Sequence, residues 1–201
     1  MRAGRLLAAA AAAYLTCAVA WSAAPAKDEE PPEVRYAAML EREYGPLGKT
    51  TEQILANEKT YEAVTVVGAL VYRIRAKPVE RLSVIERRLL AIYGLKEEVD
   101  NSGFNLYFAG PLGDGSALAL QGLRDMGAAQ IAKPVQKAVA VFPGGKPPAD
   151  HDKRVKVMET IKRRSQGVWG SCDDEFYLRE EGLAALALAY AKKNRSAIVL
   201  P

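Results

Sequence analysis

The sequence predicts an all-α, single-domain helical bundle that follows a cleavable N-terminal signal peptide. Apolar residues recur three and four positions apart along most of the chain, and the segments between these runs are short and contain glycine or proline. The chain has 201 residues, of which 49% are hydrophobic and 26% charged, a composition typical of a globular domain with a substantial core. Because consecutive helices with short connections pack as neighbours, these observations favour a bundle.

The first 26 residues have the three-part layout of a secretory signal peptide. Two arginines precede an alanine-rich apolar run over residues 6–20, and small residues follow it. We expect cleavage after Ala26 or Ala20, because alanine occupies the first and third positions before each of these bonds. The mature protein is therefore expected to be periplasmic or secreted.

A retained membrane anchor is the alternative interpretation of this segment. Residues 6–26 match the roughly 20 residues that a spanning helix needs. Alanine is only weakly apolar, which favours cleavage, and we expect no transmembrane span in the mature chain. Residues 27–33, acidic and rich in proline, would then form a flexible leader before the domain over residues 34–201.

The charge balance of the mature chain argues against nucleic acid as a partner. The full sequence has 28 basic and 24 acidic residues, and cleavage would remove Arg2 and Arg5 from the basic set and nothing from the acidic set. Much of the basic excess therefore belongs to the targeting segment. Cleavage also leaves Cys172 as the single cysteine, so the mature chain forms no intramolecular disulfide and depends on packing.

Turn and cap signals place the helices of the N-terminal half. A helix is predicted over residues 34–44, and Thr50-Thr51 offers a cap for the next one. We expect one helix over residues 54–75, although the β-branched residues at 64–72 leave a strand as the alternative. Lys77-Pro78 ends this element.

The C-terminal half contains clearer start and stop signals. Residues 83–86, Ser-Val-Ile-Glu, have the pattern of a capping box and start a helix that reaches Asn101. Asp114 is expected to cap a helix that Gly127 ends. Further helices are expected over 128–142, over 152–165, from Asp173 onward and over 183–194, with a loop carrying Trp169 at 167–171 and a packed tail at 198–200.

The stretch from Glu97 to Gly110 joins a charged helix end to an aromatic segment through a polar break. The short polar side chains of residues 100–102 favour helix ends and caps, and Gly103 tolerates a tight bend. Three aromatic rings then recur at i, i+3 and i+4 and share one face of a new helix. These are Phe104, Tyr107 and Phe108.

This stretch carries a family resemblance. Residues 97–108 read Glu-x-Val-x-Asn-x-Gly-Phe-x-x-Tyr-Phe, and Gly127-Ala128 and the Asp-x-x-Phe-Tyr of residues 173–177 follow. With these motifs the chain resembles the C-terminal domain of the bacterial DNA-mimic protein family over roughly residues 79–195. The usual pair of glycines reads Ser102-Gly103 here, and Asp100 stands where a second asparagine is common. The resemblance implies an all-helical, non-enzymatic interaction domain.

Six residues of this central motif allow two interpretations. They can form a recognition surface, or they can be structural, with the rings in the core, the asparagine as a cap and the glutamate in a hydrogen bond or ion pair. Aromatic residues at this spacing are what a buried helix face requires, so we favour the structural interpretation. The six are Glu98, Asn101, Gly103, Phe104, Tyr107 and Phe108.

Two groups of residues could support catalysis or metal binding. Cys172 and His151 are the single mature cysteine and the single histidine, so they form the one conventional nucleophile and base pair available. An acidic group could bind a hard cation, but it lacks the glycine and the alternating spacing of a calcium loop. Zinc is excluded because cysteine and histidine are too few, and we expect no cofactor. The acidic group is Asp173, Asp174, Glu175, Glu180 and Glu181.

A basic amphipathic helix over residues 152–165 is the most concentrated charge feature. Its cations are expected to face mostly outward, where they could bind an anionic partner such as an acidic protein, a polysaccharide or a lipid headgroup. A merely solvated face is the alternative. The cations are Lys153, Arg154, Lys156, Lys162, Arg163 and Arg164.

Three functions follow from these features. The preferred one is an exported, non-catalytic protein-interaction module whose partner is a protein of the cell envelope. The alternatives are a hydrolytic enzyme that uses Cys172 with His151 or the acidic group from Asp173 to Glu175, and a binder of anionic envelope surfaces through residues 152–165. DNA mimicry itself fits poorly, because a mimic must present phosphate-like negative charge and this chain is nearly balanced.

Overall fold

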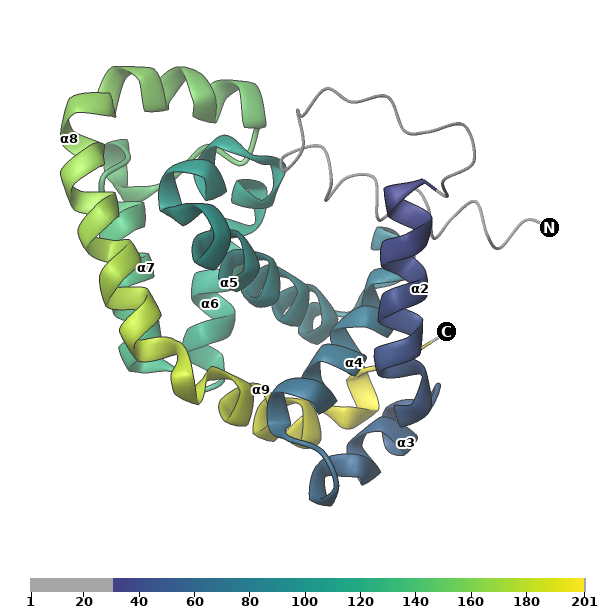
Figure 1. Cartoon of the computed structure of the whole chain (residues 1–201). Coiled ribbons are helices and arrows are strands. Elements are labelled where there is room, and N and C mark those ends of the chain that lie inside the picture. The colour runs from purple at the N-terminus through teal and green to yellow at the C-terminus, as the bar shows by residue number, and fades with distance from the viewer. Residues whose placement is uncertain (1–30, 201) are drawn as a thin grey trace. The chain divides into compact units, whose positions relative to one another are not determined.

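The structure is a computed structural model that describes residues 31–200, and within this range every regular element is helical (Figure 1). The predicted all-α class is therefore confirmed. The signal peptide expected at residues 1–26 lies outside the described range. None of the described helices combines the length and the apolar character needed to cross a membrane.

The single domain expected over residues 34–201 corresponds to two compact units. The first contains the described residues up to Leu82 together with residues 199–200, and the second runs from Ser83 to Ile198. The C-terminal residues join the first unit partly through Lys77, whose Nζ donates to the Val199 carbonyl at 2.7 Å. Each unit is described by itself below.

The first unit is built from three α-helices and short 3-10 turns between residues 31 and 82. The elements are α2 (Pro32–Tyr44), η1 (Gly45–Leu47), α3 (Thr51–Leu55), η2 (Ala56–Lys59), α4 (Ala63–Arg75) and η3 (Val79–Arg81). Thr50 caps α3 through a capping box with Gln53. The helix predicted over residues 34–44 and the cap predicted at Thr50-Thr51 are thus confirmed.

The single helix predicted over residues 54–75 is wrong, because the chain leaves the helix after Lys59 and resumes it at Ala63. The side chain of Asn57 explains part of the break, since its amide donates to the carbonyls of Gln53 at 2.8 Å and Leu47 at 2.9 Å. Such local bonds compete with helix continuation. The choice of helix over strand is confirmed for α4, where six apolar side chains are buried.

Glu41 ties α2 to α4 within the first unit. Its carboxylate accepts from the Tyr72 hydroxyl at 2.7 Å and pairs with Arg73 at 3.1 Å. The hydrogen bond from Tyr72 lowers the pKa of Glu41, and burial raises the pKa of Tyr72 to about 12. The contact therefore keeps a charged carboxylate and a neutral phenol across the pH range of most experiments.

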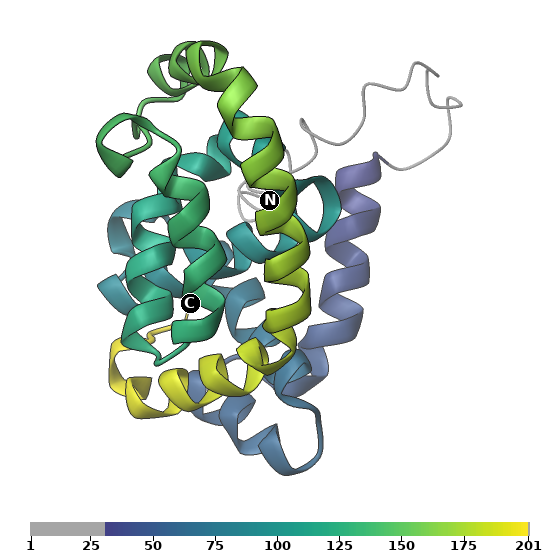
Figure 2. The ribbon, with the colours of Figure 1, turned by 90° about the vertical axis from the view of Figure 1, so that its left-hand side faces the viewer.

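The second unit is built around the long helix α5. Its elements are α5 (Val84–Ala109), η4 (Pro111–Gly115), α6 (Ser116–Asp125), α7 (Ala129–Ala140), η5 (Pro143–Gly145), α8 (His151–Arg179), η6 (Glu180–Gly182), α9 (Leu183–Lys193) and η7 (Arg195–Ala197). Helices α6 and α8 pack on α5, and α7 packs on α6 and α8. Figure 2 shows α7, in green, beside the yellow-green half of α8.

Two of the predicted helix signals in this unit are confirmed in detail. Ser83 and Glu86 form a reciprocal capping box at the start of α5. Gly127, at φ 78°, follows α6, and the amide of Ala128 donates to the carbonyl of Leu123 at 2.8 Å. This pattern is a Schellman motif, which satisfies the last carbonyls of the helix.

The aromatic core of the second unit lies between α5 and α8. The ring of Phe108 is 5.3 Å from the ring of Trp169 and 4.9 Å from that of Phe142. Phe104 meets Phe176 edge to face at 5.9 Å. Because these rings come from three separate stretches of the chain, the core joins α5, α8 and the end of α7.

The loop predicted at residues 167–171 is wrong, because α8 runs without interruption from His151 to Arg179. Each glycine in a helix interior costs about 1 kcal/mol relative to alanine, which made Gly167 and Gly170 look like breakers. Trp169 is buried on the same helix, and its Nε1 donates to the Ala138 carbonyl at 3.0 Å. Burial of Trp169 with the core offsets the poor local propensity.

Two further expectations about helix starts are wrong. Asp114 caps nothing, since α6 begins at Ser116 without a side-chain cap, and it pairs with Arg154 instead. Asp173 does not begin a helix, because it lies far inside α8. In both cases the carboxylate is used by a residue distant in sequence, which local patterns do not reveal.

Candidate functional site

The site is organised around the last six residues of α5, Phe104 to Ala109, which we call the 104–109 segment. Helical hydrogen bonding continues along α5, but Gly103 leaves the helical conformation with φ 75° and ψ 173°. The break expected over residues 100–103, before the aromatic residues, is therefore present, but only Gly103 leaves the helical conformation. Both ends of the 104–109 segment are held by side chains of α8.

Asp173 holds the N-terminal end of the 104–109 segment. Its Oδ1 accepts a hydrogen bond from the backbone amide of Phe104 at 2.7 Å. A Cβ on Gly103 would lie 2.7 Å from Oδ2 of the same carboxylate, so only glycine permits this approach. On the other side of the break, the side-chain amide of Asn101 donates to the Glu97 carbonyl at 2.6 Å, which supplies a donor to a carbonyl near the end of the preceding helix.

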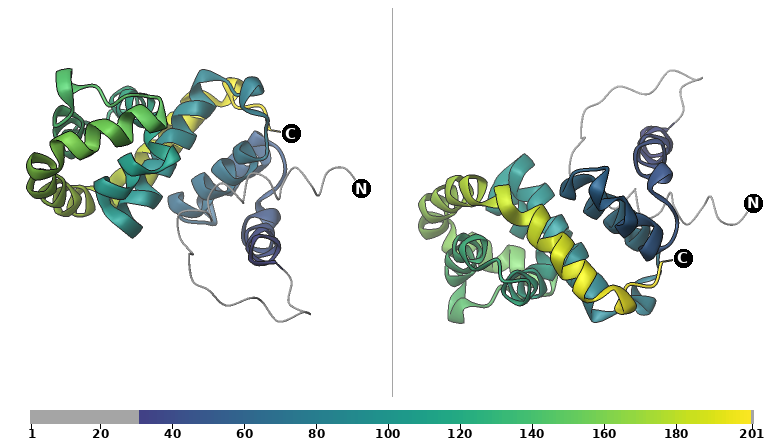
Figure 3. Two further views of the ribbon diagram at one scale, coloured as in Figure 1. Left: turned by 90° about the horizontal axis from the view of Figure 1, so that it is seen from above. Right: turned by 90° about the horizontal axis from the view of Figure 1, so that it is seen from below.

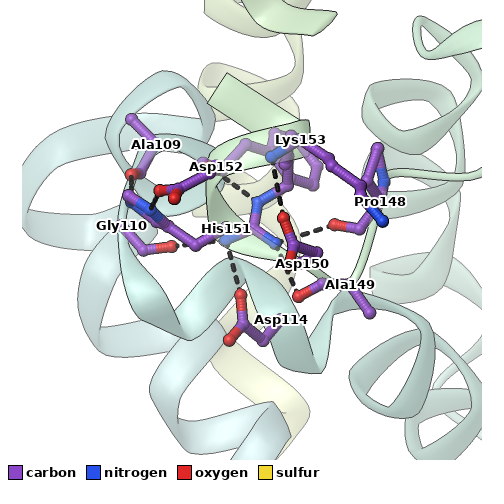
Figure 4. Close-up of polar contacts among 11 residues, drawn as sticks. Ala109, Gly110, Asp114, Pro148, Ala149, Asp150, His151, Asp152 and Lys153 are labelled. Atoms are coloured by element: carbon purple, nitrogen blue, oxygen red, sulfur yellow. Dashed lines mark hydrogen bonds and ion pairs between the residues drawn. The ribbon is translucent and has the colours of Figure 1, made fainter. Parts of the chain in front are cut away.

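Arg154 holds the C-terminal end of the segment. The side chain is fully buried, and its Nε donates to the Phe108 carbonyl at 2.7 Å. Its Nη2 donates to the Gly110 carbonyl at 2.8 Å, and Figure 4 shows Gly110 with Asp114 and Pro148 around this end of the segment. Nη2 also pairs with Asp114 at 2.7 Å, and Nη1 donates to the Pro148 carbonyl at 2.8 Å. A guanidinium is the one side chain that can serve so many acceptors in a fixed plane.

His151 adds a second α8 contact at this end. Its Nε2 lies 2.9 Å from the Ala109 carbonyl, and its Nδ1 lies 3.1 Å from the Asp152 carboxylate. These two acceptors, Asp152 first, raise the pKa of His151. With Arg154, the histidine places cationic donors at the negative end of the helix dipole, where they are favourable.

The two contacts require α8 to bend. Nineteen residues of straight helix from Arg154 to Asp173 would span about 28 Å, whereas the stretch from Gly103 to Gly110 is about 10 Å long at the same rise per residue. Figure 1 shows the two arms of α8 running in different directions. In the view from above in Figure 3, one arm lies across the picture and the other is seen nearly end-on.

Two hollows open between α5 and α8, one on each side of Asp173, and together we call them the α5–α8 groove. The Trp169 hollow has a volume of about 410 Å³ and is lined by α8 from Val155 to Asp173 and by Asn105 and Ala109 of α5. The Tyr177 hollow has a volume of about 400 Å³. It is lined by Val99, Asp100, Asp173, Asp174, Tyr177 and Leu178. Each falls in the size range of ligand pockets.

The Tyr177 hollow is acidic. Burial, and the nearby Asp174, raise the pKa of Asp173, while the bond from Phe104 works in the opposite direction. Asp100 is paired with Lys96, which also bonds Glu180 at 3.2 Å. Asp174 pairs with no cation among residues 31–200. The hollow therefore combines one unpaired carboxylate with one that is partly desolvated.

The residues of the central motif separate into buried and accessible ones. Phe104, Tyr107 and Phe108 are fully buried, so their rings offer no surface to a partner. Gly103 and Glu98 are half-buried and Asn101 is exposed. The burial of the rings agrees with a packing role for them. The hydroxyl of Tyr107 has no hydrogen-bond partner among the described residues, and burial raises its pKa.

The prediction that Arg154 belongs to an outward basic face over residues 152–165 is wrong. Its side chain is buried, because its guanidinium donates to carbonyls at the end of α5. Arg164 donates to the Val141 carbonyl. Five of the predicted cations, Arg164 among them, are exposed along the N-terminal arm of α8. They are Lys153, Lys156, Lys162, Arg163 and Arg164.

The structure does not bring Cys172 and His151 together. His151 begins α8, whereas Cys172 lies in the other arm and is buried. Burial raises the pKa of the Cys172 thiol to about 11, the opposite of what a nucleophilic thiolate needs. The Cys172 and His151 pair, an alternative left open by the sequence, is therefore not formed in the structure.

The acidic residues of α8 and η6 do not form a metal centre in the described part of the chain, where no group of three or more histidine, cysteine or acidic side chains could hold an ion. Glu175 pairs with Lys137 at 2.6 Å and with Arg179 at 3.0 Å. Glu180 pairs with Lys96 at 3.1 Å. Two of the five acidic residues are thus used in ion pairs.

Tyr177 and Leu178 were not singled out as site residues by sequence reasoning. The signal was present, since two large apolar residues follow an acidic run on a helix, but their exposure depends on the direction of α8. Gly170 was interpreted as part of a loop. Its position in the lining of the Trp169 hollow required the continuous helix.

The fold and the groove define an all-helical domain in which a kinked central helix is held at both ends by one bent helix. The family model described as DMP19-like protein matches residues 80–194, more than half of the chain. The chain therefore belongs to the DMP19-like protein family, which confirms the resemblance to the DNA-mimic proteins. No curated protein and no solved structure matches the chain.

Proposed function

We propose that the chain is an exported, non-catalytic protein-interaction module, and that its DMP19-like domain binds a protein partner in the cell envelope. The observation that carries the proposal is the α5–α8 groove. Two hollows of about 400 Å³ each lie open within the residues that the family model covers. Their lining mixes apolar and polar side chains, as protein-binding surfaces do.

The structural contacts of the potentially catalytic side chains support a binding role. Arg154 and His151 serve the end of α5, and Asp173 serves the amide of Phe104. The buried thiol of Cys172 has a raised pKa. A catalytic role for Arg154, His151 or Asp173 would require that residue to leave its structural contact.

Export is the part of the proposal that depends on residues 1–26. The test is the intact mass of the native protein from separated periplasmic and cytosolic fractions. We expect periplasmic material that begins at Lys27 or Trp21, as cleavage after Ala26 or Ala20 would produce. Full-length protein in the cytosol would overturn the export proposal and would move the search for partners to the cytosol.

The binding role is tested by affinity capture from the periplasmic fraction with the mature chain as bait. We expect one protein to be enriched and, once purified, to bind the mature chain saturably in calorimetry. A captured protein that shows no saturable binding after purification is excluded as the partner. If every enriched protein behaves in this way, the interaction proposal fails.

A second candidate function is the binding of anionic envelope surfaces. The observation that favours it is the exposed set of five cations on the N-terminal arm of α8. Association with phosphatidylglycerol vesicles should then weaken steeply as salt rises, because exposed charges are screened within about 10 Å at 0.1 M salt. Replacing Lys153, Lys156 and Arg163 by glutamine should abolish it. Vesicle binding that weakens neither with salt nor with these substitutions excludes the surface-binding function.

DNA mimicry is the rival that the family suggests. Near balance of charge in the mature chain argues against it, since a mimic must present closely spaced negative charge. We expect the mature protein to leave the complex of a DNA-binding protein with DNA intact in a gel-shift assay. Displacement of the DNA at stoichiometric protein would reverse this preference.

A further inference from the structure

The α5–α8 groove has two hollows of different character, and the difference indicates what occupies them. The Trp169 hollow is lined by the large apolar side chains of Trp169 and Met158 and by polar and charged residues, among them Asn105, Glu159, Lys162 and Gln166. Trp169 contributes to the lining although it is 2% exposed, so an occupant would meet the face of the core. Trp169 and Met158 suit an apolar side chain, and the polar lining residues can bond the backbone next to it.

The Tyr177 hollow suits a cation. Tyr177 and Leu178 are 71% and 79% exposed, which is unusual for large apolar residues side by side on a helix. Three carboxylates line the same hollow, and the one on Asp174 has no cation among the described residues. The long alkyl part of a lysine or arginine can cover Tyr177 and Leu178 while its charge meets the carboxylates.

Asp173 is the lining residue that the two hollows share. Its Oδ1 is used by the Phe104 amide, whereas Oδ2 receives no hydrogen bond within residues 31–200. Because burial raises the pKa of Asp173, a bound cation would stabilise its charged form. A cation near Asp173 is therefore favoured by the unused oxygen as well as by the neighbouring Asp174.

The spacing of the hollows sets the length of the occupant. Trp169 and Tyr177 are eight positions apart on α8, which corresponds to about 12 Å of helix. An extended chain advances about 3.3 Å per residue, so about four residues cover the same distance.

Gly170 supports an open groove. It lies on a helix, lines the Trp169 hollow, and a Cβ built there would touch nothing within 4 Å. No neighbour in the described chain requires glycine at this position, and glycine costs helix stability of about 1 kcal/mol. A side chain at this position would narrow the hollow.

We propose that the α5–α8 groove binds an extended segment of a protein partner that places an apolar side chain in the Trp169 hollow and, about four residues away, a lysine or arginine in the Tyr177 hollow. The inference rests on the proposed function and adds the chemistry of the partner. The carboxylates of Asp173 and Asp174, neither of which pairs with a cation among the described residues, select a basic segment over an acidic one.

The test uses Trp169 as its own reporter. The sequence has two tryptophans, Trp21 and Trp169, so Trp169 is the single tryptophan of the chain from Lys27 onward and its fluorescence can be excited selectively. The probe is a blocked synthetic nonapeptide of glycine and serine that carries one leucine and one arginine four positions apart. Two comparison peptides replace the leucine by serine or the arginine by citrulline, and a third replaces the arginine by glutamate.

We expect a saturable change in Trp169 fluorescence with the leucine–arginine peptide, at a Kd below about 1 mM. Each single replacement should weaken binding by about tenfold or more, and the glutamate peptide should show no binding. The inference is overturned if the signal is not saturable up to about 5 mM, or if the citrulline and glutamate peptides bind as well as the arginine peptide.

Two matched pairs of variants place the binding in the groove. Gly170→Leu should fill the Trp169 hollow and weaken binding at least about tenfold, whereas Gly167→Leu changes a glycine with equally open surroundings that does not line it. Asp174→Lys should have a similar effect, and Glu181→Lys, an exposed charge reversal outside the hollow, should not. Equal effects within either pair would overturn the assignment to the groove.

The same variants separate this inference from the proposed function. If a captured envelope protein binds Gly170→Leu and Asp174→Lys as well as the unmodified chain, the interaction module stands and the groove assignment fails. If no envelope protein is captured and the peptide still binds with the expected variant pattern, the groove assignment stands and the envelope partner fails.

Discussion

The two ends of the 104–109 segment are held by the same helix in opposite ways. At the C-terminal end, the buried guanidinium of Arg154 serves the carbonyls of Phe108 and Gly110 together with the Asp114 carboxylate. At the N-terminal end, the half-buried Asp173 makes one bond to the Phe104 amide and faces two hollows. A cation thus meets the carbonyl end of the helix and an anion meets the amide end, as the helix dipole favours.

This difference separates a side chain that stabilises the fold, Arg154, from one that can contact a ligand, Asp173. A buried charge without partners costs several kcal/mol, so the fold must satisfy Arg154 completely. A half-exposed carboxylate costs much less and can keep an oxygen free for solvent or a ligand. We call the end held by Arg154 the closed end and assign it to the stability of the fold. We call the end held by Asp173 the open end and assign it to binding.

The largest effect is expected at the closed end, with Arg154→Met. Loss of the guanidinium leaves the buried carbonyls of Phe108 and Gly110 without donors, and we expect the free energy of unfolding to fall by about 3–5 kcal/mol. Urea denaturation of the mature chain measures it. The control, Arg163→Met on the exposed face of α8, should change it by less than about 0.5 kcal/mol. A similar small effect for both variants would break the comparison.

Gly103→Ala tests the open end. The new side chain must adopt φ 75° and ψ 173°, and its Cβ would lie 2.7 Å from the Asp173 carboxylate. We expect a loss of about 3 kcal/mol in unfolding free energy. Gly167→Ala, in regular helix with open surroundings, should instead gain up to about 1 kcal/mol. If both glycine variants are stabilising, the kink at Gly103 does not exist in solution.

Tyr107→Phe sharpens the description of the closed end. The hydroxyl of Tyr107 is buried near Arg154 and Asp114 without a hydrogen-bond partner among the described residues. Its removal should raise the unfolding free energy by about 1 kcal/mol, because the desolvated hydroxyl no longer has to be buried. Tyr190→Phe is the control, since its hydroxyl has a partner in Arg88 at 3.4 Å. A clear loss for Tyr107→Phe would show that the hydroxyl is satisfied.

The smallest effect is the pH dependence of the open end. Burial raises the folded-state pKa of Asp173 above its ordinary value of 3.8, so the folded chain retains the proton to higher pH than the unfolded chain. The unfolding free energy of the unmodified chain minus that of Asp173→Asn should therefore fall as pH rises through the folded-state pKa. Urea denaturation between about pH 3 and about pH 6 measures this difference. A rise with pH would mean that the Phe104 amide outweighs burial.

Local signals predicted much of the fold. The capping box at Ser83, the stop at Gly127 and the conformational break at Gly103 depend on residues within four positions of one another, and all three are present. The helical choice for α4 was correct in the same way. Where one helix was expected over residues 54–75, Asn57 found acceptors on η1 and α3, and the helix was divided.

Long-range contacts overruled local signals in α8. Gly167 and Gly170 indicated a loop, yet the burial of Trp169 and Phe176 on one face keeps the helix continuous. Arg154 belonged to a basic stripe in sequence and became the most buried charge of the site. The α5–α8 groove could not be predicted for the same reason, since it depends on where a bent helix meets a kinked one.

The amino-acid sequence by itself determined the helical class, the family and the positions of most helix ends, because these depend on residue types a few positions apart. The tertiary structure decided which charged groups are buried, that Asp173 and Arg154 hold opposite ends of one segment, and where the surface stays open. Those outcomes depend on side chains that meet across dozens of residues, and their energies arise from desolvation and pairing that exist only after the helices pack.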